Sequence, residues 1–171
     1  LVIGGSQGAH AINEAMVAAA PVIAQISGGL EITHQTGVAD VDAVRAAYRR
    51  AEIDAKVECF FDLMDEEMHA ADLVVCRAGA TTLAELAAAG RPSLIVPFPR
   101  AASDHQRGNA QVMVEAGSAE LIDEMDLGAC FATRLLDLIG NRERLQEMSR
   151  AACRLARPDA AEKIVGRVDR K

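Results

Sequence analysis

The sequence predicts an α/β fold, a Rossmann-like, doubly wound parallel sheet of about six strands. Short apolar segments alternate along the chain with longer, Ala-rich segments that have helical spacing. The apolar segments lack the polar–apolar alternation of a half-exposed strand, which indicates burial on both faces, as in parallel sheets. Parallel strands joined by helices cross over in a right-handed sense, and repeated crossovers of this kind build a doubly wound sheet.

The apolar segments place the strands, and the intervening segments place the helices. The predicted strands are Leu1–Ile3, Leu30–Gln35, Lys56–Phe60, Leu73–Cys76, Ser93–Val96 and Ala119–Ile122. The predicted helices are Ala9–Gln25, Val41–Ala51, Leu63–Ala70, Thr82–Ala89 and Gln106–Glu115, followed by helical chain from Leu127. Gly90 is a typical residue just after a helix end, and Pro158 breaks the last helical region, so that 159–171 is expected to form a separate C-terminal helix.

Composition bounds the class of protein. Of the 171 residues half are hydrophobic but only 3% are aromatic, so we expect a core of Ala, Val, Leu and Ile. A net charge of −7 argues against a nucleic-acid partner and against electrostatic docking to anionic lipid. No apolar run approaches the roughly 20 residues of a transmembrane helix. Four widely spaced cysteines without a CxxC pair indicate reduced thiols rather than a zinc site.

The chain has no evident linker or repeat, so 1–171 is expected to be one domain. It opens inside an apolar strand, and we therefore expect it to be a fragment of a longer protein. Ligands of such sheets bind outside the carboxyl ends of the strands, which selects the loops after Ile3, Phe60, Cys76 and Val96. The scattered histidines His10, His34 and His69 are expected at the surface or at the edge of the core rather than as ligands.

The first of these loops, Gly4–Ala9, suits a diphosphate. Its glycines allow close approach of the backbone, and the following helix offers unpaired N–H groups and about half a positive charge. The same pattern also fits a tight strand-to-helix turn that holds no ligand. The spacing departs from GxGxxG, and His34-Gln35 stand where a dinucleotide site has an acidic residue, so a NAD site is disfavoured.

Two further loops carry polar groups. Within the loop 77–85, Glu85 could accept hydrogen bonds from two ribose hydroxyls, but Thr82-x-x-Glu85 also matches a capping box, which the local pattern favours. The loop 97–110 brings His105, Gln106 and Asn109 within five positions, all able to bind sugar hydroxyls. Taken alone, it also reads as a solvated helix entry capped by Ser103 or Asp104.

Taken in order, these motifs resemble the C-terminal domain of the MurG glycosyltransferases, in glycosyltransferase family 28. The resemblance covers nearly the whole chain, and the ordered set is specific although each motif alone is weak. The matching segments are Gly4–Ala9, Phe60–Met64, Ala71–Glu85, Gly90–Pro92, Pro97–Pro99 and Asp104–Ala110.

The resemblance implies the C-terminal half of a two-domain GT-B enzyme. Such an enzyme transfers N-acetylglucosamine from UDP-GlcNAc to lipid I with inversion, forms lipid II for peptidoglycan, and works peripherally at the cytoplasmic face of the bacterial inner membrane. It implies no metal, no cofactor and no catalytic residue in this chain, because the general base and the lipid I site lie in the N-terminal domain. The isolated chain is expected to be soluble, to bind donor weakly and to transfer nothing, and 159–171 would cross back to that domain.

The resemblance also assigns the donor site. Gly5, Ser6, Gln7 and Gly8 would meet the diphosphate. The backbone of Phe61 would read the uracil edge, with Phe60 and Met64 packing nearby. Glu85 would hold the ribose hydroxyls, against the local preference for a cap. The remaining donor contacts would come from Gly79, Ala80, Thr81, Thr82, His105, Gln106 and Asn109.

Two other interpretations stay open. The chain could belong to another GT-B UDP-sugar enzyme, such as a glycolipid glycosyltransferase or a UDP-GlcNAc 2-epimerase, whose strand-end loops would be similar. It could also be a non-catalytic nucleotide-binding or protein-interaction module, which would bind nucleotide without depending on Glu85.

Overall fold

Six parallel strands form one sheet at the centre of the molecule, in the order β3-β2-β1-β4-β5-β6. The computed structural model describes residues 1–4, 9–26, 30–99 and 105–156. The strands are β1 (Val2–Ile3), β2 (Ile32–Gln35), β3 (Ala55–Glu58), β4 (Val74–Cys76), β5 (Ser93–Ile95) and β6 (Ala119–Leu121). The prediction of a Rossmann-like, doubly wound sheet is confirmed. The strand order reverses between β1 and β4, the position where ligands bind in such sheets.

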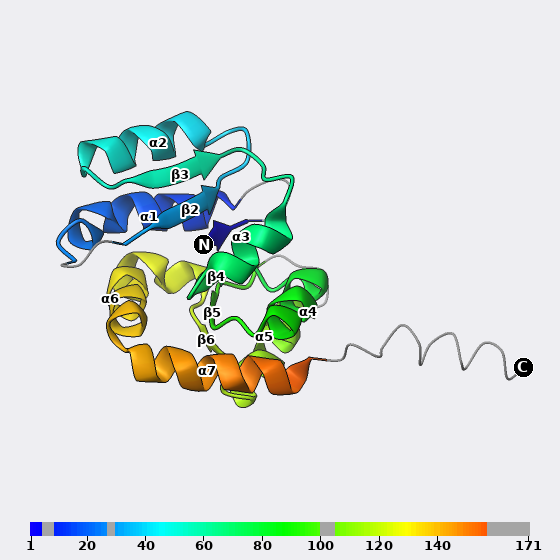
Figure 1. The fold of residues 1–171 in the computed structure, drawn as a ribbon. Coiled ribbons are helices and arrows are strands. Elements are labelled where there is room, and N and C mark those ends of the chain that lie inside the picture. The colour runs from blue at the N-terminus through cyan, green and yellow to red at the C-terminus, as the bar shows by residue number, and fades with distance from the viewer. Residues whose placement is uncertain (5–8, 27–29, 100–104, 157–171) are drawn as a thin grey trace, which may run out of the picture.

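Helices cover both faces of the sheet, as Figure 1 shows. The helices are α1 (His10–Ile23), α2 (Val41–Arg50), α3 (Met64–Ala70), α4 (Ala80–Ala89), α5 (His105–Glu115), α6 (Leu127–Gly140) and α7 (Arg142–Leu155), with a 3₁₀ turn at Glu124–Asp126. One face packs on α1, α2 and α6, and the other packs on α3, α4 and α5. The helix α7 follows α6 and passes along α4.

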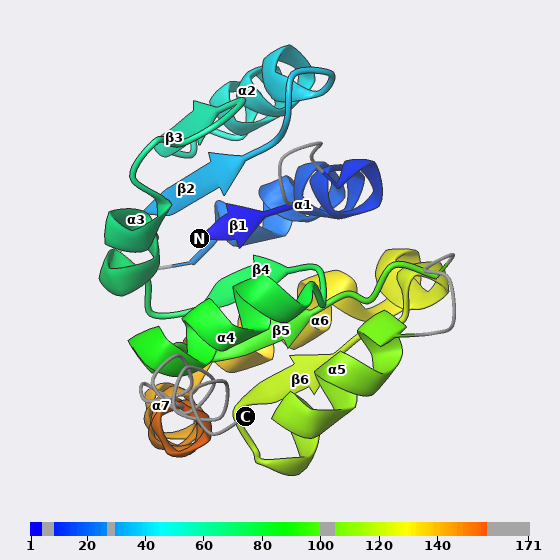
Figure 2. The ribbon, with the colours of Figure 1, turned by 90° about the vertical axis from the view of Figure 1, so that its right-hand side faces the viewer.

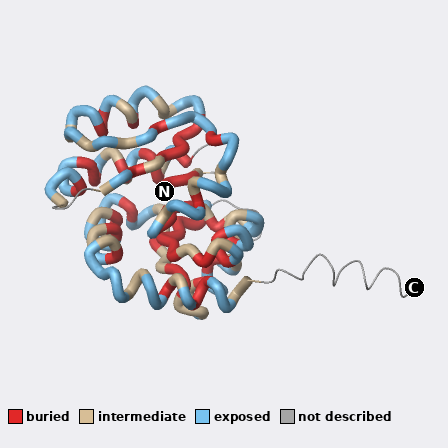
Figure 3. Tube along the Cα trace, viewed as in Figure 1, coloured by how far each residue is buried: buried red, intermediate tan, exposed pale blue. Residues whose placement is uncertain are grey.

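Successive strand residues enter opposite cores, because side chains alternate across a strand. In the first core Val2, Val75 and Leu94 pack against α1 and α6. Their strand neighbours, among them Ile3 and Cys76, enter the second core with α3, α4 and α5. Both cores are visible as buried segments in Figure 3. Burial of both faces explains why the strands read as unbroken apolar runs.

Three local predictions were wrong or incomplete. The third strand ends at Glu58, so Phe60 lies in the loop that follows it. The fourth helix begins at Ala80, two residues earlier than predicted. The helical region after Leu127 is divided at Asn141, whose side chain accepts a hydrogen bond from the Arg144 amide at 2.9 Å and caps α7. The predicted last helix within 159–171 lies outside the described residues.

Candidate functional site

The loops that leave the carboxyl ends of the strands lie along one edge of the sheet, which Figure 2 shows from the side. Large apolar side chains are exposed along this edge although most of their kind are buried elsewhere. They are Val38 after β2, Phe60 and Leu63 after β3, Phe98 after β5 and Met125 after β6. Exposed apolar groups gathered beside polar loops are typical of a binding surface.

The glycine-rich loop leads into α1 at this edge. Its residues Gly5, Ser6, Gln7 and Gly8 lie outside the described residues, so their predicted contacts stay predictions. The helix behind it begins at His10, and Ala9 occupies the N-cap position without a side-chain cap. The first turn of α1 also lacks an acidic residue. The positive end of its dipole is therefore not neutralised by its own first turn.

The helix α4 begins in the same way on the adjacent strand. Gly79 is its N-cap, no side chain caps it, and its first turn contains no acidic residue. The first helical hydrogen bond runs from the Leu83 amide to the Gly79 carbonyl at 3.0 Å, so the amides of the three preceding residues, Ala80, Thr81 and Thr82, are left without helical acceptors. Because β1 and β4 are neighbours, α1 and α4 begin side by side along this edge, one on each face of the sheet.

The structure overturns the capping box that the local pattern favoured at Thr82. Because α4 starts at Ala80, Thr82 is already its third residue and cannot be the N-cap. Glu85 therefore does not fold back onto the helix start. It is exposed, and among the described residues it has no hydrogen-bond or ion-pair partner. A carboxylate in this position remains available to hydroxyl donors.

Two predicted sugar contacts tie neighbouring loops together. The Oε1 atom of Gln106 accepts hydrogen bonds from the amides of Phe98 at 2.9 Å and Ala78 at 3.3 Å. The Nδ2 atom of Asn109 donates to the Ala78 carbonyl at 3.3 Å. His105, the first residue of α5, is exposed. The structure thus brings Gln106 and Asn109 to the loop that starts α4, with His105 beside them in the chain.

Arg77 is a residue of this edge that the sequence reasoning missed. Its Nη1 atom donates to the carbonyls of Val96 at 3.2 Å and Pro97 at 3.3 Å, and Nη2 pairs with Glu124. The guanidinium also lies 5.3 Å from the centroid of the Phe98 ring. Arg77 therefore joins the loops after β4, β5 and β6. An arginine directly after a fully apolar strand was the available signal, because a cation there needs partners nearby.

The loop after β3 presents one phenylalanine outward and one inward. Phe60 is 56% exposed, whereas Phe61 is buried with the Lys56 ammonium 4.9 Å from its ring centroid. Met64, the first residue of α3, is half-buried. The Phe61 amide donates to Oε1 of Gln35 at 3.0 Å. A base that meets this loop would find the Phe61 peptide already held by a side chain of β2.

A network of polar side chains joins β2 to α1 and α2 next to that loop. The side-chain NH₂ group of Asn13 donates to the Thr36 carbonyl at 2.9 Å and to the Asp40 carboxylate at 2.7 Å. The Oδ1 atom of Asn13 is left to accept from Nε2 of His34 at 3.0 Å. Nδ1 of His34 must then accept from the Tyr48 hydroxyl at 2.9 Å. His34 is fully buried, so its predicted place at the surface or core edge was wrong, and burial lowers its pKa to about 3.

Comparisons with known proteins identify the family of this domain. The family model described as the glycosyltransferase family 28 C-terminal domain matches residues 1–164. The chain belongs to this family.

The crystal structure of MurG from Acinetobacter baumannii superposes on this family 28 domain with a TM-score of 0.90. The two are 34% identical, and the match covers 99% of this chain and 51% of that one. A putative UDP-N-acetylglucosamine 2-epimerase from Listeria monocytogenes matches with a TM-score of 0.60 at 19% identity, over 98% of this chain and 44% of that one. The second likeness shows the fold alone.

Relatives with curated names are similar over almost all of the family 28 domain. Proteins from Nitratidesulfovibrio vulgaris and Geobacter sulfurreducens are 48% and 46% identical to it, each over 96% of this chain. Both are named UDP-N-acetylglucosamine–N-acetylmuramyl-(pentapeptide) pyrophosphoryl-undecaprenol N-acetylglucosamine transferase. The chain spans 45% and 46% of their lengths, so it corresponds to somewhat less than half of each relative.

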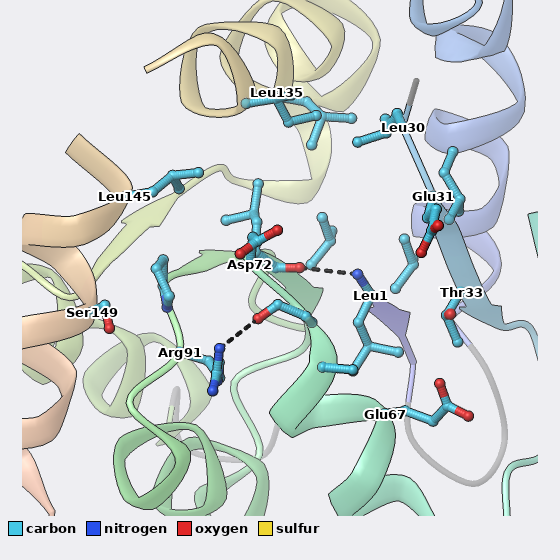
Figure 4. Close-up of a pocket in the computed structure, with 18 of the residues that line it drawn as sticks. Leu1, Leu30, Glu31, Thr33, Glu67, Asp72, Arg91, Leu135, Leu145 and Ser149 are labelled. Atoms are coloured by element: carbon cyan, nitrogen blue, oxygen red, sulfur yellow. Dashed lines mark hydrogen bonds between the residues drawn. The ribbon is translucent and has the colours of Figure 1, made fainter. Parts of the chain in front are cut away.

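A cavity of about 880 Å³ opens at the opposite edge of the family 28 sheet, near the amino ends of the strands (Figure 4). Leu1, Ile32 and Leu73 line it, and the Leu1 amino group donates to the Leu73 carbonyl at 3.0 Å. Beside it Arg91 donates to the Ala71 carbonyl at 2.9 Å. The lining includes no residue of the predicted donor site, so the cavity and that site lie at opposite ends of the strands.

The described part of the chain shows neither a metal-binding cluster nor a membrane-spanning helix. Within residues 1–4, 9–26, 30–99 and 105–156, no group of three or more His, Cys, Asp or Glu side chains is arranged to hold a metal ion. Over the same residues, no helix has the length and apolar character needed to span a bilayer.

Proposed function

We propose that this chain is the donor-binding domain of an inverting N-acetylglucosaminyltransferase that moves GlcNAc from UDP-GlcNAc to lipid I and forms lipid II in peptidoglycan synthesis. One observation carries the proposal. The uncapped amino end of α4 and the carboxylate of Glu85, which has no partner among the described residues, lie on one helix beside the point where the strand order reverses. Family membership and the names of the relatives support the same substrate.

The diphosphate would bind where α1 and α4 begin. Each helix end offers unpaired amides and a partial positive charge, which suit a phosphate group. Thr81 and Thr82 add hydroxyl donors in the first turn of α4. In the glycine-rich loop, Ser6 with Gly5, Gln7 and Gly8 would approach the phosphates from the side of β1.

The nucleoside would lie between the loop after β3 and α4. Glu85 is exposed and has no partner among the described residues, so its two oxygens can accept from two ribose hydroxyls at once. The uracil would meet the backbone at Phe61, with the exposed ring of Phe60 and the side chain of Met64 against it. The proposed base site therefore combines apolar contact with backbone hydrogen bonds.

The sugar would bind along the start of α5. Gln106 uses its Oε1 atom to hold the loops after β4 and β5, which leaves its NH₂ group for a sugar oxygen. Asn109 donates to Ala78, which leaves its own carbonyl as an acceptor. His105 adds an exposed imidazole, and Gly79 and Ala80, at the start of α4, would lie next to the phosphates.

The chemistry follows from where charge develops. Cleavage of the bond between the anomeric carbon and the diphosphate places negative charge on the departing UDP. Helix amino ends held in advance can stabilise that charge without reorganising during the reaction. The acceptor hydroxyl attacks from the opposite face of the sugar and needs a general base there. We assign no such base to residues 1–171.

We place the base, the lipid I site and the membrane-binding surface in a further N-terminal domain, which would account for the part of the relatives that this chain does not span. The complete enzyme would act peripherally at the cytoplasmic face of the bacterial inner membrane. Residues 1–171 would then form the donor domain, with 159–171 crossing back to its partner.

Calorimetric titration of the chain with UDP and UDP-GlcNAc tests the binding. We expect weak binding that Glu85→Gln reduces by about tenfold, since a hydrogen bond to a charged group contributes about 1.5–3 kcal/mol. The matched control is Glu143→Gln on α7, an exposed glutamate far from this edge, which should leave binding unchanged. Absence of binding heat at millimolar UDP would contradict the proposed donor site.

The rival interpretations give different outcomes. A nucleotide-binding module without this chemistry would bind UDP with no dependence on Glu85. Lipid II synthesis by residues 1–171 alone would contradict the assignment of the base to another domain. Another UDP-sugar enzyme would, as the full-length protein, prefer hydrolysis, epimerisation or a different acceptor when UDP-sugars are compared.

A further inference from the structure

The strand pairing between β2 and β3 continues for two residues beyond the strands and then stops. The amides of Thr36 and Gly37 donate to the carbonyls of Glu58 at 3.0 Å and Cys59 at 3.2 Å. The chain then turns away from the sheet at Phe60, and the Phe61 amide, which is buried, has no strand to pair with. A buried amide in this position needs an acceptor from elsewhere.

Gln35 supplies that acceptor from the last position of β2. It is 3% exposed, and its Oε1 atom accepts from the Phe61 amide at 3.0 Å across 26 residues of sequence. Its neighbour His34 points toward α1 and α2, where it bonds to Asn13 and Tyr48. Side chains alternate across a strand, so Gln35 points to the other face, on which α3 packs.

We propose that Gln35 is the positioning residue of the nucleobase site. By holding the Phe61 peptide, it keeps one backbone geometry in the loop 60–64, with the ring of Phe61 inward and the ring of Phe60 outward. This inference rests on the proposed function, because it assumes that a uridine nucleotide binds at this loop. Gln35 is assigned no contact with the base itself.

The surroundings of the two phenylalanine rings explain how one hydrogen bond can fix the peptide between them. The Phe61 ring is packed beneath Lys56, whereas Phe60 is more than half exposed. The peptide between the two rings is oriented by the hydrogen bond from the Phe61 amide to Oε1 of Gln35. With that amide engaged, we assign the recognition of the base edge to a backbone carbonyl of the loop.

A fixed carbonyl acceptor discriminates between pyrimidines. Uracil presents an N–H donor at ring position 3, whereas cytosine presents an acceptor there. A rigid loop at Phe61 should therefore prefer UDP to CDP, and a loop that can rotate its peptide should lose part of that preference. Pyrophosphate has no base, so its binding should not depend on Gln35.

The test titrates the 171-residue chain and its variants with UDP, CDP and pyrophosphate. Gln35→Met has similar length but no acceptor, and it should weaken UDP binding about tenfold and bring the UDP-to-CDP ratio toward one. Thr33→Val, on the same face of β2 and two residues earlier, is the matched control and should change nothing.

Pyrophosphate binding separates a positioning role from general damage to the fold. It should stay within about twofold in every variant. Hydrogen exchange of the Phe61 amide, followed by NMR in the unmutated chain, adds a measurement that does not depend on a variant folding. That amide should be strongly protected, and rapid exchange would overturn the inference.

The outcomes distinguish this inference from the function on which it rests. If the unmutated chain fails to bind UDP, the proposed function and the inference fall together. If it binds UDP but Gln35→Met keeps the same affinity and the same preference over CDP, the inference alone is wrong. Tighter UDP binding by Gln35→Met would also overturn it, because Gln35 would then compete with the base.

Discussion

The two halves of the carboxyl edge are held together by different chemistry. Behind β1 and β2 the fully buried links join neutral side chains, since His34 bonds to both Asn13 and Tyr48, and the carboxylate of Asp40 meets this group only through Asn13. After β4 and β5 the loops are held together by a charged side chain, since Arg77 donates to two carbonyls and pairs with Glu124. Neither half depends on regular secondary structure alone.

Burial explains the difference. His34 is fully enclosed, whereas the Arg77 side chain remains 13% exposed and its Glu124 partner 26% exposed. Enclosing a charge is costly unless it is fully paired, so a sealed site favours neutral groups and a partly open one tolerates an ion pair. In the half nearest to the proposed base the linking side chains of Asn13, His34 and Tyr48 are enclosed, while in the half nearest to the proposed sugar site those of Arg77 and Glu124 keep contact with solvent.

The largest effect is expected in the neutral half. Asn13→Leu should lower the free energy of unfolding by about 3–4 kcal/mol, because the His34 ring, the Thr36 carbonyl and Asp40 all lose a partner. Urea denaturation measures it. Asn109→Leu, which removes one half-buried bond in the other half, should cost about 1 kcal/mol. Equal losses in the two variants would contradict the comparison.

The charged half should lose somewhat less. Arg77→Met removes two bonds to carbonyls and leaves Glu124 unpaired, so we expect a loss of about 2–3 kcal/mol in the same denaturation assay. Arg134→Met is the control. The Arg134 side chain is 49% exposed, so its ion pair with Glu120 should contribute less than about 1 kcal/mol. If Arg77→Met loses as little free energy of unfolding as the control, the contacts of Arg77 do not stabilise the fold.

The third expected effect depends on pH. His34 is neutral in the folded protein, where burial lowers its pKa to about 3, but it takes up a proton near pH 6.5 when unfolded. The unfolded state therefore binds more protons between these values, and stability should fall as pH falls from about 6.5 toward 3. The slope from this one group is at most about 1.4 kcal/mol per pH unit.

Asp40 adds to the loss at lower pH. Burial acts to raise the pKa of Asp40, but the hydrogen bonds from Asn13 and His10 together with the charge of His10 outweigh burial and lower that pKa. Its contribution is thus present above the unfolded value near 3.8 and is lost as pH falls through the folded pKa. Denaturation of His34→Gln at several pH values checks the assignment. In that variant the free energy of unfolding should depend less steeply on pH between pH 4 and 6.5. An unchanged slope would exclude His34 as the source of the pH dependence.

Local patterns were sufficient for the sheet, because a strand buried on both faces must be apolar along its length. Val74–Cys76 and Ser93–Ile95 were located this way, and the loops after them followed. The patterns failed where two interpretations use the same residues. Thr82 and Glu85 match a capping box, and only the observed helix start at Ala80 excludes it.

The chain's own residue order thus determined the fold class, the order of its elements and the edge at which a ligand would bind, because hydrophobic periodicity is a local property and strands joined by helical crossovers all end at one edge of the sheet. Which side chains hold that edge was decided by tertiary structure. Gln35 meets the Phe61 amide, and Arg77 meets Glu124, across long stretches of sequence. A hydrogen bond requires two groups within about 3 Å, and folding alone brings residues so distant in sequence to that separation.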